Sequence, residues 1–178
     1  METQYDKLEP NIYGKIAQTL QHVTPILDIG CGDGRLVNFL AKKLGKKIFG
    51  VDVSSIGFEK AKREAELRNV SCMVEYVKAD ASYLDAFLGE FFGGVVSVYT
   101  LHEFEDPLVV LREIERVLKT GGTVVIVDFI KGGEAERLWG ERYYTPTEIE
   151  SMLKDAGFKE PKMSFLYKDV IFIFATKT

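Results

Sequence analysis

Cysteine, histidine, tryptophan and proline are scarce in this 178-residue chain, which has two cysteines, two histidines, one tryptophan and five prolines. Two cysteines, Cys31 and Cys72, cannot supply a disulfide framework, and they favour a reducing, cytoplasmic setting. The apolar runs fall well short of the ~20 residues that a membrane-spanning helix needs. The acidic, polar start at residues 1–6 is unlike a signal peptide. The sequence therefore predicts a cytoplasmic protein without a membrane span.

The chain also lacks net positive charge. It has 23 lysines and arginines against 27 aspartates and glutamates, which gives a formal net charge of −4. This balance does not favour a general nucleic-acid surface. One local basic cluster, at Lys42, Lys43, Lys46 and Lys47, falls around a predicted helix end, where lysines favour the helix dipole. We interpret it as a solvated face.

Short apolar runs alternate with helical stretches through most of the chain. The predicted strands are 25–29, 47–51, 72–77, 95–99 and 123–129, and the predicted helices are 34–44, 55–68, 83–88 and 107–118. Strands separated by helices need right-handed crossovers, which make a mostly parallel sheet. The predicted fold class is therefore α/β, a doubly wound, Rossmann-like sheet.

The two ends of the chain depart from this alternation of strands and helices. Residues 12–22 have the pattern of a short helix ahead of the first strand, and residues 129–144 form a polar connection long enough to be a lid. Thr145-Pro146-Thr147-Glu148 has the form of a capping box that opens another helix. Two last runs, 162–167 and 170–176, indicate a hairpin.

No repeat, low-complexity tract or linker divides the chain, so we expect a single domain over residues 1–178. Its expected parts are an N-terminal helical segment (1–24), a ligand-binding core (25–129), and a lid, helix and terminal hairpin (130–178).

Three glycines, Gly30, Gly32 and Gly34, follow the first predicted strand and open a helix. Glycines there let the backbone turn sharply and approach a ligand, and the helix start presents free N–H groups. A dinucleotide fingerprint needs a glycine three residues after its second glycine, where this chain has Arg35. A nicotinamide-linked oxidoreductase is therefore disfavoured.

The carboxylates around this turn narrow the choice of ligand class further. Asp28 and Asp33 flank the glycines and would repel a pyrophosphate, whereas S-adenosylmethionine carries an ammonium and a sulfonium. Asp52 ends the second strand near the ~20-residue offset of a ribose-binding acid, and Asp80 ends the third, where it could accept from an adenine amino group. These acids lie at the carboxyl ends of successive strands, where open α/β sheets bind ligands.

Several stretches together resemble the class I S-adenosylmethionine-dependent methyltransferases, in style most like the small-molecule ubiquinone and menaquinone-biosynthesis group. Ile26-Leu27-Asp28-Ile29-Gly30-Cys31-Gly32-Asp33-Gly34 matches the first motif, Gly50-Val51-Asp52-Val53-Ser54 the ribose-binding segment, and Lys78-Ala79-Asp80-Ala81 the adenine-binding segment. Arg116–Gly122 resembles the lead into the fifth strand, with Thr120 where a proline is common. The resemblance runs from about residue 25 to 129.

The resemblance implies a seven-stranded sheet whose last strand is antiparallel, a small-molecule acceptor, no metal, and S-adenosylhomocysteine as the product. The cofactor-binding residues it implies are Asp28, Gly30, Cys31, Gly32, Gly34, Asp52, Val53, Asp80, Ala81, Thr100 and Leu101.

Methyl transfer is an in-line displacement, so a base helps only where the acceptor must lose a proton. His102 is the better candidate because its reference pKa lies near neutrality, and Glu103 is second. His102 could instead bond to backbone and shape the pocket. The aromatic residues Tyr5, Trp139 and Tyr143, with His102, are candidates for lining the substrate pocket.

Other functions stay open at this stage. A protein or RNA target would need an added recognition surface, for which the lysine cluster is the only local support. A non-catalytic partner subunit that binds S-adenosylmethionine is another alternative. No sizeable insertion forms a cap, so either the pocket is shallow or a second subunit, as in a homodimer, closes it.

Overall fold

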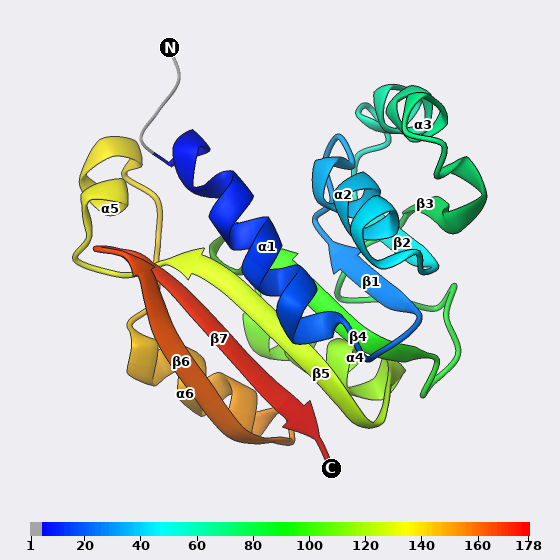
Figure 1. Ribbon diagram of the computed structural model, residues 1–178. Coiled ribbons are helices and arrows are strands. Elements are labelled where there is room, and N and C mark those ends of the chain that lie inside the picture. The colour runs from blue at the N-terminus through cyan, green and yellow to red at the C-terminus, as the bar shows by residue number, and fades with distance from the viewer. Residues whose placement is uncertain (1–4) are drawn as a thin grey trace.

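A computed structural model of the chain describes residues 5–178. Its centre is one seven-stranded sheet with strand order β3-β2-β1-β4-β5-β7-β6 (Figure 1). The strands are β1 (Ile26–Ile29), β2 (Ile48–Asp52), β3 (Val74–Lys78), β4 (Phe92–Val98), β5 (Leu118–Phe129), β6 (Phe158–Tyr167) and β7 (Val170–Lys177). The first five run parallel, and β7 pairs antiparallel with both β5 and β6. The predicted α/β sheet with an antiparallel last strand is confirmed.

Helices cover both faces of the sheet (Figure 1). They are α1 (Glu9–Leu20), α2 (Arg35–Leu44), α3 (Phe58–Leu67), α4 (Pro107–Val117), α5 (Glu134–Trp139) and α6 (Pro146–Asp155), with 3-10 turns at Asp6–Leu8, Ser71–Met73 and Leu101–Glu103. The helices α1, α2 and α3 pack on one face and α4 and α6 on the other. The short α5 lies within the predicted lid connection.

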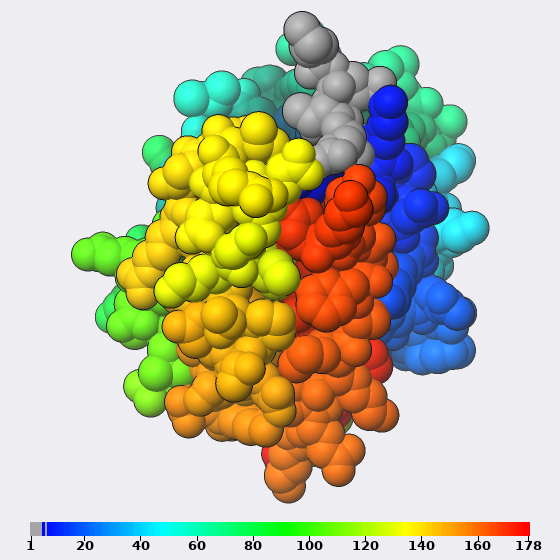
Figure 2. Space-filling model, turned by 90° about the vertical axis from the view of Figure 1, so that its left-hand side faces the viewer, coloured from blue at the N-terminus to red at the C-terminus, as the bar shows by residue number. Residues whose placement is uncertain are grey.

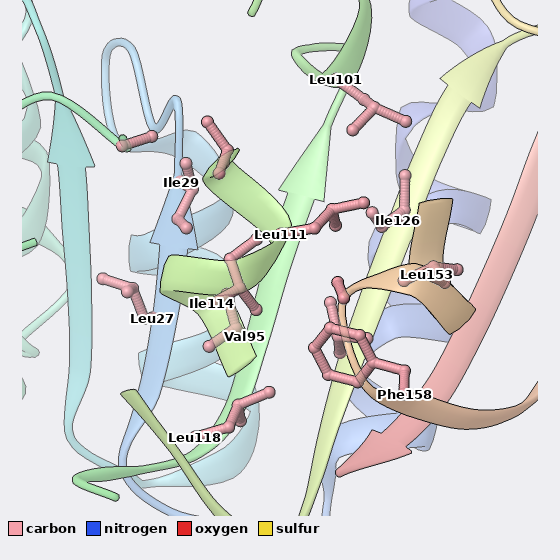
Figure 3. Packing of buried hydrophobic residues seen from close by; sticks show 14 of the residues in the cluster. Leu27, Ile29, Val95, Leu101, Leu111, Ile114, Leu118, Ile126, Leu153 and Phe158 are labelled. Atoms are coloured by element: carbon pink, nitrogen blue, oxygen red, sulfur yellow. The ribbon is translucent and has the colours of Figure 1, made fainter. Parts of the chain in front are cut away.

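The alternation of side chains along each strand makes two apolar cores, one on each face. Leu27 and Ile29 of β1 face α4 and α6, together with Ile114 and Leu153 (Figure 3). Ile26 of β1 faces the opposite core, under α1 and α2. Because β1 is buried on both faces, its one polar residue, Asp28, is buried as well.

The predicted helix at residues 83–88 is wrong, because this segment is a series of turns. Side chains of α4 satisfy its backbone in place of a helical ladder. The Leu84 amide donates to Glu113 Oε2 at 3.0 Å, and the Arg116 guanidinium donates to the carbonyls of Leu84 and Phe87 at 3.2 and 3.3 Å. Leu84 and Phe87 still reach the core. Contacts with α4 thus override the local helical preference of this segment.

The remaining differences concern element ends. The helix predicted at 12–22 begins at Glu9, the one predicted at 55–68 begins at Phe58, and the strand predicted at 123–129 begins at Leu118. The strand predicted at 72–77 begins at Val74 because Ser71–Met73 forms a 3-10 turn. None of the helices in the described range 5–178 is long and apolar enough to cross a membrane. The division into parts of one domain stays a prediction.

The predicted capping box at the start of α6 is confirmed. Thr145 Oγ1 accepts from the Glu148 amide at 3.2 Å, and Glu148 Oε2 accepts from the Thr145 amide at 2.7 Å. We expect Thr145→Ala to lower the free energy of unfolding by about 0.5–2 kcal/mol because it removes this cap. Chemical denaturation measures the change, and Thr147→Ala, at the exposed second residue of the helix, is the matched control. Equal losses in the two variants would contradict the assignment.

Candidate functional site

The turn between β1 and α2 is built for close approach of the backbone. Gly30 has φ +73°, and a Cβ there would lie 2.3 Å from Thr100 Cγ2. Gly34 caps α2 with φ +72°, and a Cβ there would lie 2.6 Å from Tyr76 Oη. Only glycine fits either position without strain. The glycine turn therefore brings the start of α2 against the ends of β3 and β4.

A cleft of about 520 Å³ opens at the carboxyl ends of β1, β2, β3 and β4. It is where an open parallel sheet is expected to bind a ligand. Eight predicted site residues line it: Gly30, Gly32, Asp52, Val53, Asp80, Ala81, Thr100 and Glu103. The structure therefore brings predicted site residues from four strand ends to one cavity.

A second cavity of about 290 Å³ adjoins the first and shares Gly30, Gly32, Val98 and Tyr99 with it. Asp28 and Cys31 line this second cavity, beside Arg35 of α2. Burial and the charge of Asp52 raise the pKa of Asp28 well above its ordinary value. No hydrogen-bond donor to the Asp28 carboxylate lies within the described part of the chain. A buried, unpaired carboxylate at a cavity is suited to a cationic ligand.

The other two strand-end carboxylates are already oriented by backbone amides. Asp52 Oδ2 accepts from the Gly32 amide and Oδ1 from the Ser54 amide, both at 2.9 Å. Asp80 Oδ1 accepts from the Ser82 amide at 2.8 Å. Each carboxylate oxygen has a second lone pair, so both side chains can still accept hydrogen bonds from hydroxyl or amino groups of a ligand. This set of acceptors fits the hydroxyl and amino groups of S-adenosylmethionine.

Asp33 has a different role from the other acids. Its carboxylate pairs with Arg35 Nε at 3.1 Å and with Lys60 Nζ at 2.7 Å. Burial alone would raise the pKa of Asp33, but these two cations lower it. Asp33 thus ties the glycine turn to α2 and α3, and Gly34 stands at the helix cap.

His102 is held by a carboxylate that the sequence did not single out. Asp128, at the end of β5 and 1% exposed, accepts from the His102 amide at 3.0 Å and pairs with Nδ1 at 2.7 Å. Burial by itself lowers the pKa of His102, but the hydrogen bond and charge of Asp128, with Glu103 and Glu141, raise it above its ordinary value. The ring is fixed by its Nδ1 side, and Nε2 is the nitrogen that can exchange a proton.

The lid connection reaches this imidazole from the other side. Glu141 Oε2 lies 3.3 Å from His102 Nε2 and accepts from Tyr143 Oη at 2.7 Å. The Tyr143 ring lies 4.6 Å from the imidazole, centroid to centroid. Glu103 faces the first cleft, and burial, with Glu141 and Asp128, raises its pKa despite the opposite effect of His102. Three carboxylates thus surround one histidine.

Three predicted substrate residues, Tyr5, Tyr143 and Trp139, lie together with His102 but outside both cavities. Phe129 is their common contact, with ring centroids at 4.9, 5.7 and 5.2 Å respectively. Tyr5 and Tyr143 are buried, whereas Trp139 is 44% exposed. The structure therefore gathers these aromatics around the end of β5.

Two predicted cofactor residues have no contact with either cavity. Leu101 is 1% exposed and packs in the core beside Leu111 and Ile126 (Figure 3). Gly34 serves the close approach of α2 to β3. Asp128 and Glu141 were missed, although Asp128 ends a predicted strand just as Asp28 and Asp52 do.

No group of three histidine, cysteine or acidic residues suited to a metal ion occurs in the described chain. Three of the four lysines in the cluster at the end of α2 contact backbone or acidic groups. Lys42 donates to the Arg68 carbonyl at 3.2 Å, Lys46 to the carbonyls of Gln21 and Val23, and Lys47 pairs with Glu75.

Comparison with known proteins places these features in a family. The family described as "Methyltransferase domain" matches residues 27–126. The chain is 35% identical to 2-phytyl-1,4-beta-naphthoquinone methyltransferase of Arabidopsis thaliana, over 62% of this chain and 43% of that protein. It is 26% identical to ubiquinone biosynthesis O-methyltransferase of Ruegeria sp., over 93% of this chain and 75% of that protein.

Among solved structures, a SAM dependent methyltransferase from Aquifex aeolicus has the same fold, with a TM-score of 0.73, 22% identity and coverage of 95% of this chain and 98% of that one. The chain spans about half the length of several curated relatives that it matches.

Proposed function

Because the chain belongs to the methyltransferase domain family, we propose that it transfers a methyl group from S-adenosylmethionine to a small-molecule acceptor by in-line displacement. One observation carries the proposal: Asp28, Asp52 and Asp80 line two joined cavities at the ends of adjacent strands, with the glycine turn between them. This arrangement suits a ligand with a cationic amino-acid part and a nucleoside part, and it does not suit a pyrophosphate.

Roles follow for the residues around the cavities. Asp28 would face the ammonium group, Asp52 the ribose hydroxyls, and Asp80 with the Ala81 amide the adenine edge. Cys31, Val53 and Thr100 would complete the walls. When bound, S-adenosylmethionine supplies an electrophilic methyl group whose departure leaves a neutral thioether, so most of the acceleration comes from positioning.

His102 would act on the acceptor. Asp128 fixes its Nδ1 side, so Nε2 would take the proton that an acceptor hydroxyl loses as its oxygen bonds to the methyl carbon. Glu103 is the weaker alternative because it is exposed to the first cleft rather than held. One named relative is a naphthoquinone methyltransferase and the other a ubiquinone biosynthesis O-methyltransferase, and these names support a small, flat acceptor for this chain. We propose no metal for this reaction.

Replacing Asp52 tests the cofactor site. We expect Asp52→Ala to weaken S-adenosylmethionine binding about 10- to 150-fold, because hydrogen bonds to a charged group contribute about 1.5–3 kcal/mol. Isothermal titration measures the dissociation constant. The control is Asp155→Asn, an exposed site at the end of α6. Lack of binding by the folded wild-type chain would refute the proposed function.

The alternatives from the sequence gain no support. Three of the four clustered lysines, Lys42, Lys46 and Lys47, already contact groups of the chain itself, so the cluster adds no support for an RNA or protein target. Methyl transfer by the purified chain alone would exclude a non-catalytic partner role. We propose a cytoplasmic setting, supported by the two free cysteines. A homodimer stays a proposal, which light scattering of the purified chain tests.

A further inference from the structure

Tyr99, the residue that follows β4, is held in a backbone conformation that tyrosine rarely adopts. Its φ is +56°, in the left-handed region where a bulky side chain is strained. The Tyr99 amide donates to the Val127 carbonyl at 2.8 Å. The next side chain, Thr100, is anchored as well, since its hydroxyl lies 2.5 Å from Ser97 Oγ and 3.3 Å from the Ile29 carbonyl oxygen. Strain that the surroundings fix in this way is concentrated at functional positions.

The position of Tyr99 is the junction of the two cavities of the proposed cofactor site. Tyr99 lines both of them, whereas Phe104 lines only the first and Tyr13 only the second. The other residues common to both cavities are Gly30, Gly32 and Val98. Among the described residues, the shared wall therefore consists of glycine backbone, one valine and one aromatic ring.

The Tyr99 ring is held from behind by other rings. It stacks on Phe129 with centroids 4.4 Å apart and planes 6° apart. Phe129 in turn meets Tyr5 edge-on at 4.9 Å and contacts Trp139 of α5 at 5.2 Å. Figure 2 shows α5 at the surface, beside the turn between β6 and β7. These packed rings cover one face of Tyr99 and fix its orientation.

The hydroxyl of Tyr99 is not the part that faces the cavities. Tyr99 Oη is buried and has no hydrogen-bond partner among the described residues, although the residue as a whole is only half-buried. Burial, with the charges of Asp128 and Asp169, raises the pKa of Tyr99, so the phenol stays uncharged. The part of the side chain left for the cavities is the ring face opposite Phe129, which is a neutral aromatic surface.

A neutral aromatic face attracts a cation, because the face of the ring carries negative charge. In the proposed function, on which this inference rests, Asp28 meets the ammonium group in the second cavity, and Asp52 and Asp80 meet the nucleoside in the first. The sulfonium group connects these two parts of S-adenosylmethionine, so it belongs at the junction of the cavities. There the Tyr99 ring is the group of the shared wall that suits a positive charge.

We propose that Tyr99 binds the sulfonium group and lets the site distinguish S-adenosylmethionine from the product, S-adenosylhomocysteine. The two molecules share their amino-acid and nucleoside parts, and the product lacks the methyl group and its positive charge. Asp28, Asp52 and Asp80 would contact only the shared parts, so those contacts do not separate donor from product. Specificity is a difference between two affinities, and the ring face supplies it by attracting only the cation. Tyr99 would thus favour the replacement of product by a new donor molecule.

Isothermal titration with each of the two ligands tests the proposal. We expect Tyr99→Leu to lower the ratio of the S-adenosylhomocysteine dissociation constant to that of S-adenosylmethionine about 2- to 30-fold, the range for loss of a cation–π contact. Tyr99→Phe keeps the ring and should keep the ratio. The control is Phe165→Leu, an exposed aromatic residue on the edge strand β6. A variant that only disturbs packing would weaken both ligands alike, so its ratio would not change.

A second measurement needs only the wild-type chain, so it decides even where Tyr99→Leu does not fold. S-adenosylmethionine with a ¹³C-labelled methyl group is followed by nuclear magnetic resonance. A methyl group held against the face of Tyr99 should give a proton signal upfield of its position in the free cofactor, because of the ring current. An unchanged ratio in Tyr99→Leu, or a bound methyl signal that is not upfield of the free one, would overturn the proposal.

The outcomes separate this proposal from the proposed function. If both ligands bind and Tyr99→Leu leaves their ratio unchanged, the role of Tyr99 fails and the proposed function stands. If the ratio falls but the purified chain transfers no methyl group, the role of Tyr99 stands and the proposed methyl transfer fails. Binding of neither ligand by the folded wild-type chain refutes both.

Discussion

Replacing His102 with alanine is expected to lower the rate of methyl transfer to a phenolic acceptor about 10²–10⁴-fold, the usual contribution of a positioned general base. Asp128→Asn should keep the shape of the pocket but lower the rate at least about tenfold, because the amide cannot stabilise the imidazolium or fix its tautomer. S-adenosylhomocysteine release measures the rate. The exposed His22, the other histidine of the chain, supplies the control His22→Ala.

The pH dependence separates a base from a residue that only shapes the pocket. A base must be neutral, so the wild-type rate should rise with pH through a pKa above the ordinary value of 6.5. In Asp128→Asn, burial still lowers the pKa of His102 while the charge that raised it is gone, so the inflection should move to lower pH. The His102–Asp128 pair correspondingly stabilises the fold below the unfolded pKa, and this stability is lost as pH rises through the folded pKa.

Nuclear magnetic resonance can follow this titration directly, since the chain has only two histidines. In wild type, His102 should titrate above the ordinary value of 6.5, and in Asp128→Asn its pKa should fall. An unchanged His102 pKa in the variant would contradict the electrostatic role of Asp128. An unchanged pH profile of the rate would leave His102 as a pocket-shaping residue only.

Local signals explain which parts of the site could be predicted. The glycine turn and the acids at positions 28, 52 and 80 each lie beside a strand whose apolar run is evident in the sequence. Parallel neighbours place such strand ends at one edge, so their convergence followed from the fold class alone. The antiparallel β7 followed from the two-residue gap that leads into it.

Long-range contacts explain what could not be predicted. Asp128 meets His102 only because β4 and β5 are neighbours and the 3-10 turn after β4 points its histidine across. Glu141 reaches the imidazole from a connection without a periodic pattern. The mistaken helix at 83–88 has the same origin, since Glu113 and Arg116 of α4 take over its backbone groups.

Asp28→Asn is expected to weaken S-adenosylmethionine binding about 10- to 150-fold and, at the same time, to raise the melting temperature of the free chain. The carboxylate is buried without a donor among the described residues, so its charge disfavours folding until a cation arrives. The amide carries no charge and removes this penalty. At this chain length each kcal/mol corresponds to about 2–4 °C. Calorimetry and isothermal titration measure both changes, with Asp155→Asn as the control.

The raised pKa of Asp28 fixes the sign of both pH dependences. The folded, free chain holds this proton more tightly than the unfolded chain, so its stability should fall as pH rises from the unfolded pKa through the folded one. The gain from Asp28→Asn should therefore be small below the unfolded pKa of Asp28 and should grow as pH rises through the folded pKa. Binding of a cation favours the ionised carboxylate, so wild-type binding should release protons and tighten as pH rises. Titration in buffers of different ionisation enthalpy counts those protons. If Asp28→Asn lost affinity without any gain in stability, Asp28 would have a partner in the free chain, and the unpaired carboxylate could no longer account for the choice of a cationic ligand.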